Sequence, residues 1–172
     1  GVNWPRLVAI SLQEGAQPVL GRRLREIASD LMPKEIAADL RQIERVGEFR
    51  QRYLERRVRE AVGALSEAGI EVMLLKGAAL AYTVYGSFSE RPMSDVDLLV
   101  RPGDAQRARD LLLSSAWAPR FDDDVDDLYE GMHHLPPLVD TRTPGLQVGL
   151  DLHTELFAEH RSPYRFDAAD LW

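Results

Sequence analysis

The hydrophobic pattern of the chain changes at Ile70, and this change limits the folds that the sequence can adopt. Over Pro33–Ala68, apolar residues recur every three or four positions, which predicts one long amphipathic helix. The same spacing predicts a helix over Pro18–Leu31. After Ile70 the apolar residues come in short runs bounded by Gly, Pro and Asp, which is typical of strands with intervening helices. We therefore expect helices first and an α+β or α/β core behind them.

Five runs after this boundary have strand character. They are Ile70–Lys76, Asp95–Val100, Trp117–Phe121, His134–Val139 and Leu146–His153. Helices are expected over Ala78–Tyr85, with Gly86 ending it, and after Asp104, whose side chain would cap it. The organisation is thus a helical segment at 1–69 and a core at 70–172. The pattern at 166–172 is that of a helix that begins, so we expect the core to continue beyond it.

Composition excludes several classes of protein. The 172 residues include no cysteine, which excludes disulfides, thiol catalysis and zinc thiolate sites. The formal charge of −7 disfavours a general nucleic-acid-binding role. There is no apolar run of about 20 residues to span a bilayer, and no charged-then-apolar leader opens the chain. We expect a cytoplasmic protein without a membrane partner.

Charged residues crowd one side of the Pro33–Ala68 helix. The members of this face include Arg41, Glu44, Arg45, Arg50, Arg52, Glu55, Arg56, Arg57 and Arg59. Because glutamates interleave with the arginines, a solvated face is expected rather than a nucleic-acid surface. The Asp122–Asp127 run is expected to be a solvated loop for the same reason. An interaction domain built on this helix is a further possibility, but it explains none of the acids described next.

Two aspartates stand at the start of the Asp95–Val100 run. Because strand side chains alternate, Asp95 and Asp97 point to one face while Val96 and Leu98 point into the core. Two carboxylates ~4 Å apart repel by about 4 kcal/mol at an effective dielectric near 20. A divalent cation relieves this repulsion, and Mg²⁺ takes such ligands and bridges them to phosphates. The structural alternatives are a turn cap for Asp95 and an exposed strand position for Asp97.

A strand-to-helix turn precedes these acids. Gly77 and Ala78 follow the apolar run, and small residues there let backbone N–H groups approach a phosphate at a helix N-terminus. Lys76 or Arg91 can neutralise phosphate charge. Alternatively, Lys76 is a solvated strand terminus and Arg91 is an ion-pair partner of the aspartates. These four residues are the predicted nucleotide-binding set.

Turn and acids together resemble a known superfamily. A strand that ends in Gly and a small residue, followed by Asp-x-Asp on the next strand, is similar to the DNA polymerase β-type nucleotidyltransferases. More narrowly, Leu-Lys-Gly-Ala-Ala-Leu at 75–80 and Arg-x-x-x-Asp-Val-Asp-Leu-Leu-Val at 91–100 resemble bacterial nucleotidyltransferase family 5. Leu-Asp-Leu-His at 150–153 resembles that family's later acidic strand. Ala78 stands where the wider superfamily has Gly or Ser, so a hydroxyl toward the phosphate is missing.

The resemblance implies a polymerase β-like core, a mixed sheet with helices packed on it, behind the N-terminal helical segment. It implies Mg²⁺- or Mn²⁺-dependent transfer of a nucleoside monophosphate from an NTP, ATP by default, with release of pyrophosphate. Gly77 and Ala78 would hold the triphosphate, and Asp95 and Asp97 would bind two metal ions. Asp151 would be the third carboxylate, ligating one ion and activating the acceptor's nucleophile. The acceptor is a small molecule, a peptide, a protein or an RNA end.

Glu155 is the other candidate for the third acid. Leu150 and Leu152 flank Asp151 as apolar residues flank Asp97, which favours Asp151. His153 shares a face with Asp151 and either lines the pocket or is a structural histidine.

Neighbouring aromatic residues are not expected to bind ligands. His133 and His134 lack partners at ligand spacing, so no metal site is expected there. Tyr82 and Tyr85 lie at helical spacing and are expected in the core.

The alternative to an enzyme is a catalytically inactive nucleotide-binding regulatory or antitoxin-like module of the same fold. The presence of all three predicted acids favours the enzyme.

Overall fold

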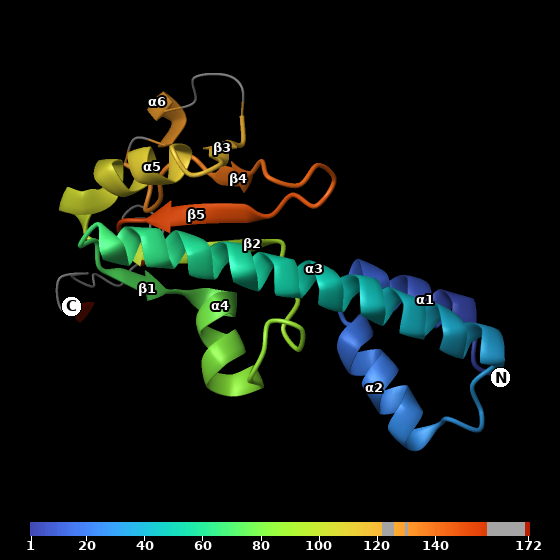
Figure 1. Ribbon diagram of the computed structural model, residues 1–172. Coiled ribbons are helices and arrows are strands. Elements are labelled where there is room, and N and C mark those ends of the chain that lie inside the picture. Colours follow the sequence, from blue (N-terminus) through green and yellow to red (C-terminus); the bar gives the residue numbers. More distant parts are fainter. Residues whose placement is uncertain (122–125, 130, 158–170) are drawn as a thin grey trace.

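The computed structural model describes residues 1–121, 126–129, 131–157 and 171–172, in which helices precede a mixed five-stranded sheet (Figure 1). The elements are α1 (Trp4–Gln13), α2 (Gln17–Ile27), α3 (Lys34–Glu67), β1 (Val72–Leu74), α4 (Lys76–Leu80), the π-helix η1 (Ala81–Tyr85), β2 (Asp95–Val100), the 3-10 helix η2 (Pro102–Asp104), α5 (Ala105–Leu113), β3 (Trp117–Pro119), α6 (Asp126–Tyr129), β4 (Leu138–Asp140) and β5 (Gly149–His153). The expected α+β fold with N-terminal helices is confirmed.

The strand order places β5, the last strand among the described residues, at the centre of the sheet. The order is β1-β2-β5-β4-β3. β2 and β5 are parallel, whereas all other neighbours are antiparallel. Parallel neighbours require a crossover connection, and here the chain passes through α5, β3 and β4 before it returns as β5. The strand that carries Asp95 and Asp97 therefore lies directly beside the strand that carries Asp151.

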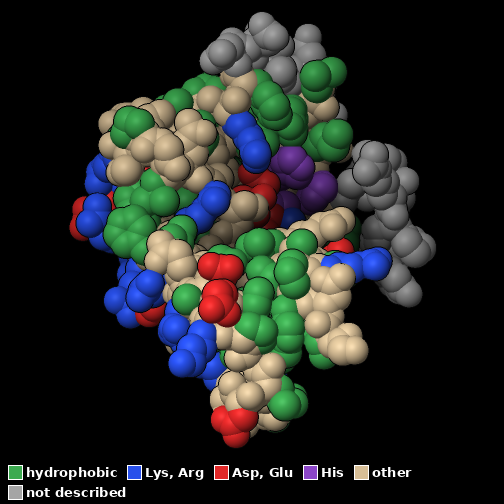
Figure 2. All heavy atoms as spheres, turned by 90° about the vertical axis from the view of Figure 1, so that its right-hand side faces the viewer, with side chains coloured by type: hydrophobic (Ala, Val, Ile, Leu, Met, Phe, Trp, Pro, Cys, Tyr) green, Lys and Arg blue, Asp and Glu red, His purple; other side chains and the backbone are tan. Residues whose placement is uncertain are grey.

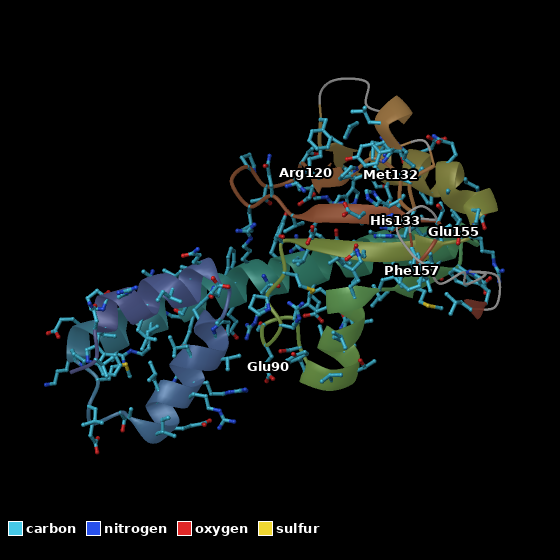
Figure 3. The ribbon with its side chains drawn as sticks, turned by 180° about the vertical axis from the view of Figure 1, so that it is seen from behind. Glu90, Arg120, Met132, His133, Glu155 and Phe157 are labelled. Carbon is cyan, nitrogen blue, oxygen red and sulfur yellow. The ribbon has the colours of Figure 1, made fainter. Side chains whose placement is uncertain are left out.

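One face of the sheet is buried against α3 and α5. Its inward side chains are at most 3% exposed and comprise Val96, Leu98, Val100, Trp117, Leu138, Val148, Leu150 and Leu152. They share a core with Leu54 and Leu65 of α3 and Leu112 of α5. Burial of each large side chain contributes roughly 1.5–3 kcal/mol, which fixes which face of each strand points inward. The alternate positions point to the opposite face, which Figure 3 shows from the side away from α3.

The N-terminal helices extend the molecule beyond the sheet. The second half of α3 covers the sheet, while α1 and α2 lie against its first half (Figure 1). The periodicity did not predict α1. Its start does carry a signal, because Asn3 Oδ1 accepts a hydrogen bond from the Arg6 N–H at 3.1 Å and a proline stands in the first turn.

The boundaries around Ile70 follow the predicted stop signals. Gly69 adopts φ 72° after α3, and Gly86 adopts φ 82° after η1, as left-handed helix ends require. The first strand is shorter than predicted, because Lys76 is the first residue of α4 and adopts φ 45°.

Some predicted environments are wrong. Arg57 belongs to the face expected to be solvated, yet it is 1% exposed, because α3 lies on the sheet there and Nε donates to Asp140 Oδ1 at 2.9 Å. Tyr82 and Tyr85, expected in the core, are 39% and 41% exposed. Small Ala78 and Ala81 supply the buried side of that helix instead.

Three further predictions concern Asp104, the acidic run and the end of the chain. Asp104 precedes α5 as expected, but its side chain makes no capping hydrogen bond and pairs with Arg107 at 3.6 Å. Residues 122–125 of the acidic run lie outside the described residues, and Asp126 begins α6 rather than continuing a loop. The helix expected at 166–172 also lies outside them, apart from the last two residues. No helix within the described ranges is long and apolar enough to cross a bilayer.

Candidate functional site

The strand register brings the predicted acids of two distant segments together. In the parallel β2–β5 pair, Asp97 lies opposite Asp151 and Asp95 lies opposite Gly149. Cross-strand partners share a face, so all three carboxylates project from the side of the sheet that α3 does not cover. The apolar residues between them hold this orientation because they are buried on the other face.

Gly149 accommodates the close approach of the two strands at their first residues. A Cβ at this position would lie 3.0 Å from Asp95 Cβ, closer than real Cβ contacts allow without a shift. The Gly149 N–H also donates to the Ser94 carbonyl at 3.0 Å. The glycine thus lets β5 pair with β2 directly beside the first acid.

Asp97 is the most heavily contacted acid of the three. Its Oδ1 accepts a hydrogen bond from His153 Nε2 at 2.7 Å and forms an ion pair with Lys76 Nζ. Lys76 reaches this oxygen from the left-handed first residue of α4, a conformation that costs a non-glycine residue roughly 1–3 kcal/mol. The turn before α4 and the acid strand are therefore joined by a charged contact.

The pKa values of the paired acids Asp97 and Asp151 are shifted in opposite directions. Burial acts to raise the pKa of Asp97, but the hydrogen bonds and charges of His153 and Lys76 outweigh it, so that the pKa is lowered. Burial raises the pKa of Asp151, and the negative charges of Asp95 and Asp97 raise it further. Asp151 Oδ1 is buried and has no hydrogen-bond partner among the described residues. His134 and His153 act to lower this pKa, but they do not outweigh burial and the two negative charges.

A divalent ion fits this arrangement. Asp97, Asp151 and His153 each offer one ligand atom, and these atoms lie within 4.8 Å of one another. The unpartnered oxygen of Asp151 is a ready ligand, and carboxylate oxygens are what Mg²⁺ and Mn²⁺ prefer. Asp95 lies on the same face of β2, two residues before Asp97, and is not one of these three potential ligands.

The predicted nucleotide-binding residues meet at the start of α4. Lys76, Gly77 and Ala78 are its first three residues, whose N–H groups have no partner within a helix, and no side chain caps this end. An added Cβ at Gly77 would lie 2.6 Å from Met93 Sδ and 3.8 Å from Arg91 Cζ. Arg91 thus lies beside the turn, and its side-chain hydrogen bond goes to the Pro92 carbonyl at 3.2 Å rather than to an aspartate.

A buried glutamine fixes the segment between turn and acids. Gln51 of α3 is 4% exposed; its Nε2 donates to the Met93 carbonyl at 2.8 Å, and its Oε1 accepts from the Met93 N–H at 3.1 Å. Met93 covers Gly77 with its side chain and stands two residues before Asp95. One side chain of the N-terminal helices therefore positions both halves of the site. Helical spacing placed Gln51 on α3 but gave no sign of this role.

The sequence did not predict a cluster of three histidines at the end of β5. The rings of His133 and His153 lie 5.1 Å apart, those of His134 and His153 5.3 Å, and those of His133 and His134 4.7 Å. A bridge between His134 and His153 brings the loop to the strand. Burial lowers the pKa of His133, and the neighbouring histidines and Lys76 lower it further. The adjacency of His133 and His134 was the only signal in the sequence.

Figure 2 shows a hollow in the surface in which charged side chains and histidines gather. Acidic side chains lie at its bottom, histidines on one side and Lys or Arg side chains on the other. Glu155, the rival of Asp151, lies beyond the end of β5 (Figure 3), where its N–H donates to the His133 carbonyl at 3.3 Å. It is not part of the group of three potential ligands. The hollow thus collects acidic, cationic and histidine side chains on one face.

Comparison with known proteins identifies a family. A family model described as uncharacterised nucleotidyltransferase matches residues 1–172. No curated protein and no solved structure matches the chain.

Proposed function

This chain belongs to the family of uncharacterised nucleotidyltransferases, and from that premise we propose that it moves a nucleoside monophosphate from an NTP to an acceptor and releases pyrophosphate. The observation that carries the proposal is the parallel pairing of Asp97 with Asp151, beside the uncapped start of α4. In this proposal residues 1–69 are a helical segment that packs on a catalytic core at 70–172.

The acids would hold two Mg²⁺ or Mn²⁺ ions, with Asp97 central and Asp95 and Asp151 on either side of it. Bound divalent ions neutralise the charge that develops on the attacking and leaving oxygens. His153 holds Asp97 in place through its 2.7 Å hydrogen bond. An orientation fixed before substrate arrives is what such a reaction needs from the protein.

The NTP is bound at the start of α4. The N–H groups of Gly77 and Ala78 donate to triphosphate oxygens, and the guanidinium of Arg91, beside Gly77, neutralises their charge. Lys76, whose side chain is 58% exposed, exchanges its ion pair with Asp97 for a contact with the triphosphate once metal ions neutralise that carboxylate. ATP is the default donor.

The reaction is a displacement at the α-phosphorus. An acceptor oxygen forms a bond to that phosphorus while the bond to the bridging oxygen breaks, and pyrophosphate leaves with the electron pair. The acceptor's proton passes to the second carboxylate oxygen of Asp151, while the unpartnered Oδ1 serves as the metal ligand.

Nucleotide binding provides the first test. Calorimetry with each NTP should show binding that requires Mg²⁺ or Mn²⁺ and disappears with a chelator. Equal affinity with and without metal would contradict the proposal.

Transfer is tested with NTP labelled at the α- or the γ-phosphate, in the presence of metabolite and protein extracts. The α-label should appear in an acceptor and the γ-label in pyrophosphate. Asp97→Asn and Asp151→Asn should abolish transfer, whereas Glu155→Gln and the exposed control Asp110→Asn on α5 should retain it. Metal-dependent binding without transfer to any acceptor would favour the inactive nucleotide-binding module.

A further inference from the structure

A second, smaller pocket opens beside the first residues of β2 and β5. It has a volume of about 390 Å³, and its lining includes Ser94, Gly149, Val139 and two arginines, Arg50 and Arg120. No Asp or Glu is among the described residues that line it. Two guanidinium groups without a counter-ion in a concave site favour an anion.

Strand register places Arg120 on the same face as the acids. Its N–H donates to the Pro137 carbonyl at 2.9 Å as β3 ends, and the neighbouring Leu138 lies opposite Leu150. One residue further along the register, Arg120 lies opposite Pro137 and Pro137 lies opposite Asp151. These three residues therefore share one face of the sheet. Figure 3 shows Arg120 toward the start of β5 and His133 toward its end.

Neither arginine is committed to a strong partner. The Arg120 side chain has no hydrogen bond or ion pair among the described residues, and Arg50 makes only a 3.4 Å contact from its NH2 nitrogen to the Gln147 carbonyl. Most other arginines of α3 are paired, as Arg52 is with Glu48. Both guanidinium forks are free to bind a ligand.

The pocket borders the acid row. Ser94 lines it, and the Ser94 hydroxyl donates to Asp95 Oδ1 at 3.2 Å. Gly149 also lines it and lies opposite Asp95 in the sheet. A molecule held by the arginines would therefore reach the carboxylates with its other end.

We propose that this pocket binds the acceptor, and that the acceptor is a small molecule with a carboxylate or phosphate group gripped by Arg50 and Arg120. This inference rests on the proposed function. An in-line displacement needs the attacking and leaving oxygens on opposite sides of the phosphorus. With the triphosphate at Gly77 on the β1 side of the acids, the acceptor enters from the β5 side, where the arginines lie.

Size and charge select this class of acceptor. The volume suits a small molecule, and the net charge of −7 disfavours a polyanion such as RNA. A larger cavity of about 720 Å³ lies between α2, α3 and the segment before β2, but there Arg25 pairs with Glu44 and Arg22 with Glu90. Its balanced charges give no preference for an anion.

Inorganic phosphate and acetate are the probes, titrated by NMR into the protein saturated with Mg²⁺ and a non-hydrolysable NTP analogue. We expect saturable binding of one or both by the wild-type protein. Arg50→Gln and Arg120→Gln should each weaken it about tenfold, the loss of one charge-assisted contact. Arg52→Gln, two residues from Arg50 on the same helix, should have no effect. Binding of phosphate alone, or of acetate alone, identifies the acceptor's anionic group.

Three results would overturn the assignment: no saturable binding of either probe, unchanged affinity in both arginine variants, or probe binding that occurs only when the NTP analogue is left out. Tighter, salt-dependent binding of an RNA oligonucleotide that requires both arginines would also overturn it. Binding of the metal–NTP complex should be equal in wild type and both variants. If the wild type fails to bind that complex, the proposed function fails, while probe binding without nucleotide still decides whether this is an anion site.

Discussion

Nε2 of His153 lies 2.7 Å from Oδ1 of Asp97, the same oxygen that Lys76 contacts from the start of α4. His153 is 1% exposed, and its other ring nitrogen, Nδ1, is buried without a partner among the described residues. Loss of a side chain that orients a metal ligand typically weakens metal binding by about 10–100-fold. Because of this short distance, His153 either orients the Asp97 carboxylate through a hydrogen bond or binds the metal ion together with it.

Either role predicts that His153→Leu weakens binding of Mn²⁺, measured by electron paramagnetic resonance without nucleotide. The loss should be about 10–100-fold, the range for residues that support metal ligands. His153→Gln keeps a donor near the Nε2 position and should recover part of the affinity. Wild-type affinity in the leucine variant would remove His153 from the metal site.

Asp97 and Asp151 should affect the stability of the metal-free protein in opposite directions. The pKa of Asp97 is lowered, so its ionised form stabilises the fold at neutral pH, and that contribution is lost as the pH falls through the lowered value. The pKa of Asp151 is raised by burial and by Asp95 and Asp97, so its ionised form destabilises the fold once the pH exceeds the unfolded value.

In thermal unfolding with a chelator at pH 7, Asp97→Asn should therefore lower Tm and Asp151→Asn should raise it. A change of 1 kcal/mol corresponds to about 2–4 °C in a chain of this size. The gain from Asp151→Asn should vanish below about pH 3.9, where an unfolded aspartate is protonated too. Shifts of the same sign in both variants would contradict this view of the acid pair.

The sequence was sufficient where the structure depends on local pattern. Alternation along β2 placed Asp95 and Asp97 on one face, and the same pattern in β5 placed Asp151 on that face beside Asp97, while its role as the third acid in place of Glu155 stays a prediction. The helical period located α3, and Gly69 and Gly86 marked helix ends that require positive φ. Each of these signals arises within a few residues of the feature it predicts.

Contacts between distant segments left no such signal. His133 and His134 meet His153 only because the loop pairs with the end of β5. Gln51 reads as an ordinary polar helix position until Met93, 42 residues later, supplies its partner. The burial of Arg57 depends on which side of α3 faces the sheet, and a helix rich in Arg and Glu does not reveal that side.

The buried ion pair of Arg57 and Asp140 is expected to be essential to stability. Both side chains are about 1% exposed or less, and the guanidinium also lies 5.1 Å from the Trp117 ring centroid. Arg57→Met leaves the buried carboxylate without its cation and with only the hydrogen bonds from the Tyr53 hydroxyl and the Arg142 N–H, so urea unfolding should show a loss of about 3–5 kcal/mol. Arg56→Met, on the exposed side of the same helix, should change stability by no more than about 0.5 kcal/mol. Equal effects would show that Asp140 finds another partner.

The paired hydrogen bonds between Gln51 and Met93 predict a variant that loosens the site without touching it. Gln51→Leu keeps the size of the side chain but leaves the Met93 N–H and carbonyl unpaired, at a cost of about 1–3 kcal/mol. The Met93 amide should lose its protection from hydrogen exchange. Because Met93 packs on Gly77 and leads into Asp95, binding of Mn²⁺ and of the metal–NTP complex should weaken together. Gln42→Leu, an exposed glutamine on the same helix, is the matched control and should alter neither. Unchanged exchange at Met93 together with unchanged binding would show that the segment before β2 keeps its conformation without α3.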